Sequence, residues 1–230
     1  MTYKSASQAL QTLADSGRAR TARAYFKNCT QDVFLGITTP QLRRLAGEYW
    51  EMKLSEIRKL MQSQVHEERS LANEILRIQF RKSGPRQQKQ IFDFYVKNRK
   101  FIREWDGVNG SAPYIVGPYL LGRSKKLLYE WARSPRLWDR RIAIVSTLWF
   151  IRQGEIADTL KLAQIVLGDG EDLIHKATGW MLREVGKQDQ AALKKFLNIH
   201  CAVMPRTMLR YAIERFPEPE RKMYMSRRKR

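Results

Sequence analysis

LWDRRIAIVSTLWFIR, residues 137–152, is apolar around nearly its whole circumference after the first turn. A helix of this kind buries every face, so residues 137–152 are predicted to form a central, buried helix. Arg140 and Arg141 stand near its N-terminal end, where the helix adds a partial positive charge. One of them could project from the buried helix into a groove. Equally, both could pair with Asp139 or Glu130.

Helical periodicity extends outward from this segment over most of the chain, and strand alternation is absent over any useful length. Short breaks such as SGP, GDG and SPR separate the predicted helices. These cover residues 5–15, 19–28, 40–50, 54–63, 67–82, 86–99, 113–122, 124–133, 137–152, 155–167, 171–186, 189–200 and 205–216.

The spacing of these helices favours a repeat architecture. Helix pairs recurring about every 35–45 residues predict an all-α, HEAT-like helical-repeat solenoid, curved, with a positively charged concave face. An irregular helical bundle without a groove is the alternative. We expect one HEAT-like repeat domain over residues 1–225. A basic C-terminal tail, SRRKR, follows over residues 226–230.

The chain is strongly basic, with 43 Lys and Arg against 23 Asp and Glu and a formal net charge of +20. This excess goes beyond what solubility requires and indicates a polyanionic partner. The hydrophobic fraction of 43%, with nine Phe, nine Tyr and six Trp, supports a folded protein with a sizeable core.

Several other classes of protein are disfavoured. The N-terminus has no apolar signal region, and the longest apolar run, residues 142–151, contains Ser146 and Thr147. Cys29, Cys201 and the three histidines are isolated from one another, so we expect no disulfide framework, metal site or cofactor. Both cysteines are expected to be buried in a reducing cytoplasm. A lipid-binding surface would need a terminal amphipathic segment with exposed Leu or Phe, and none is seen.

IHKATGWMLREVGK, residues 174–187, places a tryptophan within a row of cations. At about 100° per residue, one stripe roughly 60° wide contains Lys176, Trp180, Arg183 and Lys187. The opposite face carries an apolar stripe of Ile174, Ala177, Met181 and Val185. An indole among cations suits nucleic acid, which offers phosphates to the cations and sugars or bases to the ring. Alternatively, Trp180 packs against the next helix and the cations are solvated.

EWDGVNGSAPYIVG, residues 104–117, precedes and enters a helix expected to begin at Pro113. If residues 105–109 form one helical turn, Trp105 and Asn109 share a face, and Asp106 points about 100° away. The expected role of Asp106 is to cap or anchor the start of the helix.

This segment resembles the W-D-x-V-D…S-A-P…G stretch of the bacterial alkylpurine DNA glycosylases of the AlkD type, the DNA alkylation repair family built from HEAT-like repeats. Further matches occur in the family's order. They are YFKNCTQDVFLGITTPQLRRLA (residues 25–46), LWDRRIAI and KATGWMLREVGK.

The resemblance implies a monofunctional glycosylase that hydrolyses the N-glycosidic bond of cationic N3- or N7-alkylated purines in double-stranded DNA. It also implies that the base is not flipped out. Trp105 and Trp180 match the tryptophans that close around the lesion's deoxyribose and backbone, and Arg141 matches an arginine that contacts DNA near the lesion. The other implied DNA contacts are Lys176, Arg183, Lys187, Tyr25 and Lys27.

The family motif ends in Asp where this chain has Asn109. The family's Asp is thought to hold or activate water and to stabilise the positively charged sugar. An amide can do neither by charge or by accepting a proton, but its carbonyl oxygen can accept a hydrogen bond from water. We therefore expect Trp105, Asn109 and Trp180 to form the catalytic set, with activity reduced by Asn109.

Two other hypotheses stay open. Asn109 motivates a non-catalytic binder of damaged or branched DNA, and the charge alone would permit a HEAT-type scaffold for an acidic protein. In each case we expect a monomer without a membrane segment. We expect its location to be the bacterial cytoplasm, in association with the nucleoid.

Overall fold

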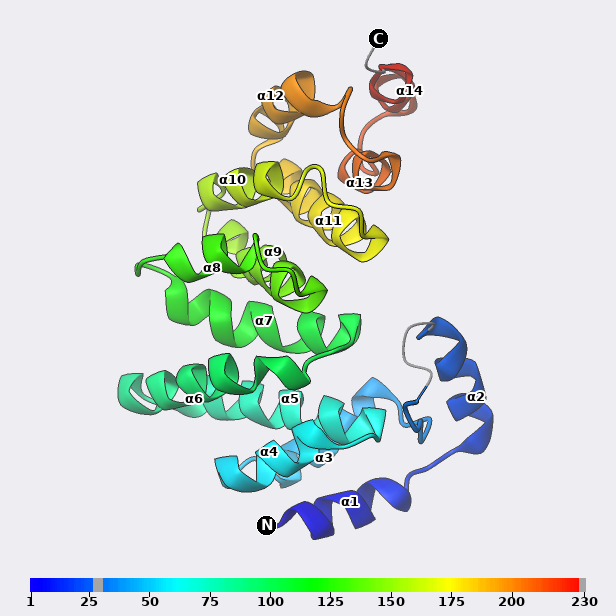
Figure 1. Ribbon diagram of the computed structural model, residues 1–230, viewed down its shortest axis with the longest axis vertical. Helices are drawn as coiled ribbons and strands as arrows, with labels where there is room; N and C mark the ends of the chain where they lie inside the picture. Colours follow the sequence, from blue (N-terminus) through cyan, green and yellow to red (C-terminus); the bar gives the residue numbers. More distant parts are fainter. Residues whose placement is uncertain (27–30, 228–230) are drawn as a thin grey trace. The chain divides into compact units, whose positions relative to one another are not determined.

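The computed structural model describes residues 1–26 and 31–227 (Figure 1). The chain divides into two compact units, Met1–Tyr119 and Leu120–Arg230. Throughout the described residues the regular structure is helical, with a single isolated β-bridge between Val33 and Val65. The all-α prediction is confirmed.

The first unit contains seven α-helices among its described residues. They are α1 (Tyr3–Gln11), α2 (Ser16–Tyr25), α3 (Thr39–Glu48), α4 (Leu54–Gln62), α5 (His66–Lys82), α6 (Pro85–Asn98) and α7 (Trp105–Leu120), with a short 3₁₀ turn, η1 (Arg99–Phe101), before α7.

The central helix of the first unit is α5, which packs against α3, α4 and α6. Its first turn is acidic and its last turn is basic, an arrangement that complements the helix dipole. Four of its side chains are fully buried in the core: Leu71, Ala72, Ile75 and Leu76. The partner helix α3 begins with a capping box between Thr38 and Gln41 and has Pro40 in its first turn.

The start of α7 differs from the prediction. The helix begins at Trp105, eight residues before the expected start at Pro113, and Pro113 and Pro118 both lie inside it. A proline in a helix interior costs about 3 kcal/mol. Burial of a Val or Ile side chain contributes ~1.5–3 kcal/mol, and α7 has three that are fully buried: Val108, Ile115 and Val116. The two effects are comparable, so tertiary burial overrides the local stop signal.

The second unit contains α8 (Lys126–Trp131), α9 (Leu137–Arg152), α10 (Ala157–Ile165), α11 (Asp172–Gln188), α12 (Gln190–His200), α13 (Arg206–Ala212) and α14 (Glu218–Ser226). As predicted, α9 is a central buried helix, and it packs against α8, α10 and α11 (Figure 1). The sequence pattern did not predict α14. It starts within the proline-containing stretch after Phe216, and Tyr224 is its one buried residue.

In α11, Gly179 allows the helix to approach α13 closely. A β-carbon at this position would lie 2.5 Å from the Met208 carbonyl oxygen and 2.5 Å from the Tyr211 β-carbon. Both distances are too short for any side chain, so the glycine is required by packing between the two helices.

The two cysteines and the predicted C-terminal tail lie only partly within the described residues. Cys201 is buried as expected, at 2% exposure, whereas Cys29 lies outside the described residues. Of the predicted basic tail, Ser226 ends α14 and the Arg227 guanidinium donates to Asn198 Oδ1 at 3.0 Å. Residues 228–230 lie outside the described part. The single domain over residues 1–225 and the basic concave face stay predictions.

Candidate functional site

A pocket in the first unit is formed by α3, α5 and the first turns of α7, and its volume is about 210 Å³. Trp105 and Asn109, two of the three predicted catalytic residues, both line it. Because α7 begins at Trp105, these two side chains stand one helical turn apart, as their spacing predicted. The other lining residues are Thr39, Leu42, Arg43, Ser70, Asn73, Glu74, Arg77, Asp106, Gly107, Gly110 and Tyr114.

Trp105 belongs to an aromatic cluster behind this pocket. The Phe26 ring stacks on the Trp105 ring, with centroids 5.4 Å apart and an interplanar angle of 8°. The Phe26 ring centroid also lies 4.5 Å from that of His66 and 5.3 Å from that of Phe34. The Phe34 and His66 rings stack with their centroids 4.8 Å apart. One face of the Trp105 indole is therefore occupied within the protein, which restricts the orientation of the ring.

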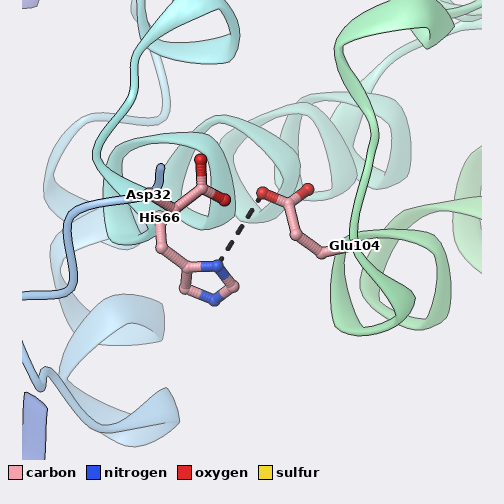
Figure 2. Close-up of side chains that lie close together, drawn as sticks. All are labelled: Asp32, His66 and Glu104. Atoms are coloured by element: carbon pink, nitrogen blue, oxygen red, sulfur yellow. Dashed lines mark ion pairs between the residues drawn. The ribbon is translucent and has the colours of Figure 1, made fainter. Parts of the chain in front are cut away.

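His66, at the start of α5, connects this cluster to the start of α7. Its Nε2 lies 2.9 Å from Asp106 Oδ2, and its Nδ1 lies 3.8 Å from Glu104 Oε1 (Figure 2 shows the latter ion pair). Burial lowers the pKa of His66, but the hydrogen bond and charge of Asp106, together with the Glu104 and Glu67 charges, raise it above its ordinary value. Asp106 Oδ1 also accepts from the Gly107 N–H at 2.9 Å, so Asp106 anchors the first turn of α7.

Asp32, His66 and Glu104 bring potential metal-ligand atoms within 4.8 Å of one another (Figure 2). The Arg69 guanidinium lies among them, bound to Glu104 and with its Nη2 2.6 Å from Asp32 Oδ2. Arg103 adds a second contact to Asp32, at 2.9 Å. Since these arginines already oppose the carboxylate charges, a cation would have to compete with them. Burial raises the pKa of Glu104 in spite of Arg69. We therefore treat the cluster as a buried ion-pair network.

Neither this network nor the α3–α5 side of the pocket was predicted from the sequence. Its one available signal is a run of charged residues, HEER, that opens a helix with a strongly apolar buried face. All four of these residues are at most 7% exposed: His66, Glu67, Glu68 and Arg69. Glu67 accepts hydrogen bonds from the backbone N–H groups of Leu35 and Gly36 at 2.9 and 2.8 Å, which fixes the segment before α3.

A basic surface helix adjoins the aromatic cluster. None of the residues of α2 is buried, and its exposed side chains include Arg18, Arg20 and Arg23. Tyr25, predicted to contact DNA, ends this helix and is 72% exposed. Lys27, also predicted to contact DNA, lies outside the described residues.

In the second unit, α11 carries the predicted tryptophan and cations. The apolar stripe is buried as predicted, with no more than 1% exposure at Ile174, Ala177, Met181 and Val185. Trp180 is half-buried on another face.

The cations of α11 are paired with acids. Lys176 Nζ lies 2.7 Å from Asp172 Oδ2, Lys187 Nζ lies 2.7 Å from Glu184 Oε1, and Arg183 forms an ion pair with Glu214. The hydrogen bond to Asp172 raises the pKa of Lys176. Two of these acids, Asp172 and Glu184, lie on α11 itself, four and three residues before the lysines they pair with, whereas Glu214 follows the helix.

The arginines at the start of α9 both have partners within the protein. Arg141 is 4% exposed and donates to the Leu173 carbonyl. Arg140 pairs with Asp169 at 2.6 Å, an acid outside the two that were considered. Asp139 lies 2.6 Å from Arg136. The partner of Arg140 lies 29 residues along the chain, so helical spacing around α9 could not predict it.

The protein is all-helical. Its indole rings and cations are candidate contacts for a polyanion. The sequence model of the family described as "DNA alkylation repair enzyme" matches residues 6–216, and the chain belongs to this family.

One similar solved structure is described as a predicted DNA alkylation repair enzyme from Enterococcus faecalis. It shares 18% sequence identity with a TM-score of 0.73, and the match covers 89% of this chain and 97% of that one. This likeness supports the helical fold. No curated protein sequence matches the chain. Among the described residues, no helix is both long and apolar enough to cross a membrane.

Proposed function

We propose that the protein is a DNA glycosylase that hydrolyses the N-glycosidic bond of cationic N3- or N7-alkylated purines. Family membership supports a role in alkylation repair. The observation that carries the finer proposal is that Trp105 and Asn109 line one pocket at the start of α7. A repair function would place the protein, acting as a monomer, at the bacterial nucleoid in the cytoplasm.

The chemistry of such substrates suits this set of residues. An alkylated purine that already carries a positive charge leaves as a neutral base, so no general acid is needed. The sugar becomes oxocarbenium-like, and an electron-rich indole face can stabilise it. Stacking on Phe26 holds Trp105 in one orientation before substrate binds, so little reorganisation is needed during the reaction. Asn109 can position the attacking water through its carbonyl oxygen.

For DNA binding we propose two sets of contacts. The first unit offers Tyr25 and the arginines of α2, and Lys27 stays a proposed contact from the resemblance. The second unit offers Trp180 and the cations of α11, with Arg141 as a further proposed contact. Because Lys176, Arg183 and Lys187 have acidic partners, each must exchange a carboxylate for a phosphate. This exchange reduces the net binding free energy that each contact with DNA contributes.

The test is release of base from duplex DNA containing 7-methylguanine, compared with the spontaneous rate. We expect release above that rate, and Trp105→Ala should lower it by about tenfold or more. Trp50→Ala is the matched control, because Trp50 also lies in the first unit beneath a cation, Lys82 at 3.8 Å, but outside the pocket. Release at the spontaneous rate would exclude the glycosylase.

The second candidate function is a non-catalytic binder of damaged or branched DNA, which Asn109 favours. It predicts tight binding to such DNA with no release of base. Under this alternative, Asn109→Asp should create a release activity that the natural chain lacks. If the substitution changed neither release nor binding, position 109 would not account for the missing activity.

A further inference from the structure

We infer that Glu74 of α5 supplies the negative charge that Asn109 cannot provide, opposing the cationic sugar and accepting the proton of the attacking water. This inference rests on the proposed glycosylase function. Glu74 lines the same pocket as Trp105 and Asn109, yet it comes from a different helix and from outside every motif that indicated the function.

The pocket geometry places Glu74 against the relevant turn of α7. Its residue exposure is 8%, and its Oε1 lies 4.0 Å from the point where a β-carbon on Gly110 would stand. One turn earlier, a β-carbon on Gly107 would lie 3.2 Å from Asn73 Nδ2. The glycine at position 107 therefore leaves room for the Asn73 amide. Since Gly110 directly follows Asn109, the Glu74 carboxylate borders the turn that carries Asn109.

Two arginines that also line the pocket hold the carboxylate. Arg77 Nη1 lies 3.2 Å from Glu74 Oε2 and Arg43 Nε lies 3.6 Å from Glu74 Oε1. The Arg77 guanidinium is itself held over the Tyr114 ring, 4.5 Å from its centroid. The Arg43 side chain is 56% exposed, so a DNA phosphate can compete with Glu74 for it. Loss of that contact would leave more of the carboxylate charge to act on the sugar.

The proposed step balances as a hydrolysis. The bond between C1′ and the purine nitrogen breaks, and its electron pair neutralises the positive charge of the leaving base. The oxygen of water bonds to C1′, and one water proton passes to the Glu74 carboxylate and then to solvent. A glutamate carries a negative charge at neutral pH and can accept this proton, whereas an amide cannot.

The experiment measures single-turnover release from a 7-methylguanine duplex, together with binding to a duplex containing a stable abasic-site analogue. Glu74→Gln should lower release by about a hundredfold while binding stays within about threefold. Adding Asn109→Asp to this variant should restore release to within about tenfold of the natural chain, because it returns a carboxylate to the same pocket. Glu48→Gln is the matched control: Glu48 pairs with Arg44 at 3.3 Å on α3, outside the pocket.

Three results would overturn the inference while the glycosylase proposal stands. These are normal release by Glu74→Gln, equal loss of binding and release, or no restoration by Asn109→Asp. Asn109→Asp alone gives a further check that requires no change at position 74. If Glu74 already supplies the charge, this variant should release base less than about tenfold faster than the natural chain. An increase in the release rate of about a hundredfold would overturn the inference. Release by the natural chain no faster than the spontaneous rate would instead defeat the proposed function, and this inference with it.

Discussion

His66 Nε2 lies 2.9 Å from Asp106 Oδ2, and Asp106 directly follows Trp105. The same imidazole contacts the Phe26 ring that stacks on Trp105. One buried side chain of α5 is thus connected to the candidate tryptophan in two ways, through the backbone at the start of α7 and through an aromatic stack. The orientation of Trp105 should therefore depend on the state of residues that do not line the pocket.

The first prediction concerns pH. Because the folded-state pKa of His66 is raised above its ordinary value of 6.5, the protonated imidazole contributes stability that is fully present below pH 6.5. That contribution is lost as pH rises through the folded-state pKa. The free energy of unfolding should therefore fall as pH rises above 6.5, and His66→Gln should remove this decline. Chemical denaturation across this range measures it.

A second histidine provides the control. Burial lowers the pKa of His200 on α12, so His200→Gln should leave the decline above pH 6.5 in place. The groups that face His66 are the carboxylates of Asp106, Glu104 and Glu67. A stability difference between the natural chain and His66→Gln that does not change with pH would contradict a charged imidazole.

The second prediction concerns the stack on Trp105. Phe26→Ala should lower the rate of base release, because Trp105 loses the ring that limits its orientation. The same substitution should lower the free energy of unfolding by ~0.5–1.5 kcal/mol beyond the effect of lost burial, because the aromatic pair is removed. Phe34→Ala is the control, since Phe34 contacts Phe26 and His66 in the same cluster. Equal release by the two variants would show that stacking on Trp105 itself has no role.

The sequence pattern predicted most of the helices because apolar spacing records which face is buried. The stripe of Ile174, Ala177, Met181 and Val185 and the all-round burial of α9 were both read correctly for this reason. Pro113 misled the prediction of α7, since a local stop signal carries no information about the burial that overrides it.

The candidate site was only half predictable. Trp105 and Asn109 share a helix, so their spacing was sufficient to place them together. Ion-pair partners are different: Arg183 and Glu214 stand 31 residues apart, and Arg69 and Asp32 stand 37 apart. Periodicity within one helix cannot identify such partners, and this is why the ion-pair network around His66 and the position of Glu74 in the pocket were not predicted.

The third prediction tests the packing of α11 on α13. Gly179→Ala should destabilise the protein by ~1–3 kcal/mol, because the new β-carbon would meet the Met208 carbonyl and Tyr211. Gly47→Ala should have the opposite effect, a gain of ~0.5–1 kcal/mol, since Gly47 lies in α3 with no heavy atom within 4 Å of the new β-carbon. Thermal or urea unfolding compares the two. Destabilisation by both variants would show that open space at a helical glycine does not predict the sign.

The fourth prediction separates DNA from an acidic protein as the partner of the basic surface. Affinity for duplex DNA should fall linearly on a log–log plot against salt, and Arg20→Gln should reduce the slope by about one, since α2 exposes this cation without burying any residue. Lys89→Gln is the control, because Lys89 of α6 is 62% exposed but held by Asp93 at 2.6 Å. If both variants gave the same slope of log affinity against log salt, α2 would not contact DNA. Weak binding that does not respond to salt would favour a scaffold for an acidic protein, because phosphate contacts release counterions and no such release would then be taking place.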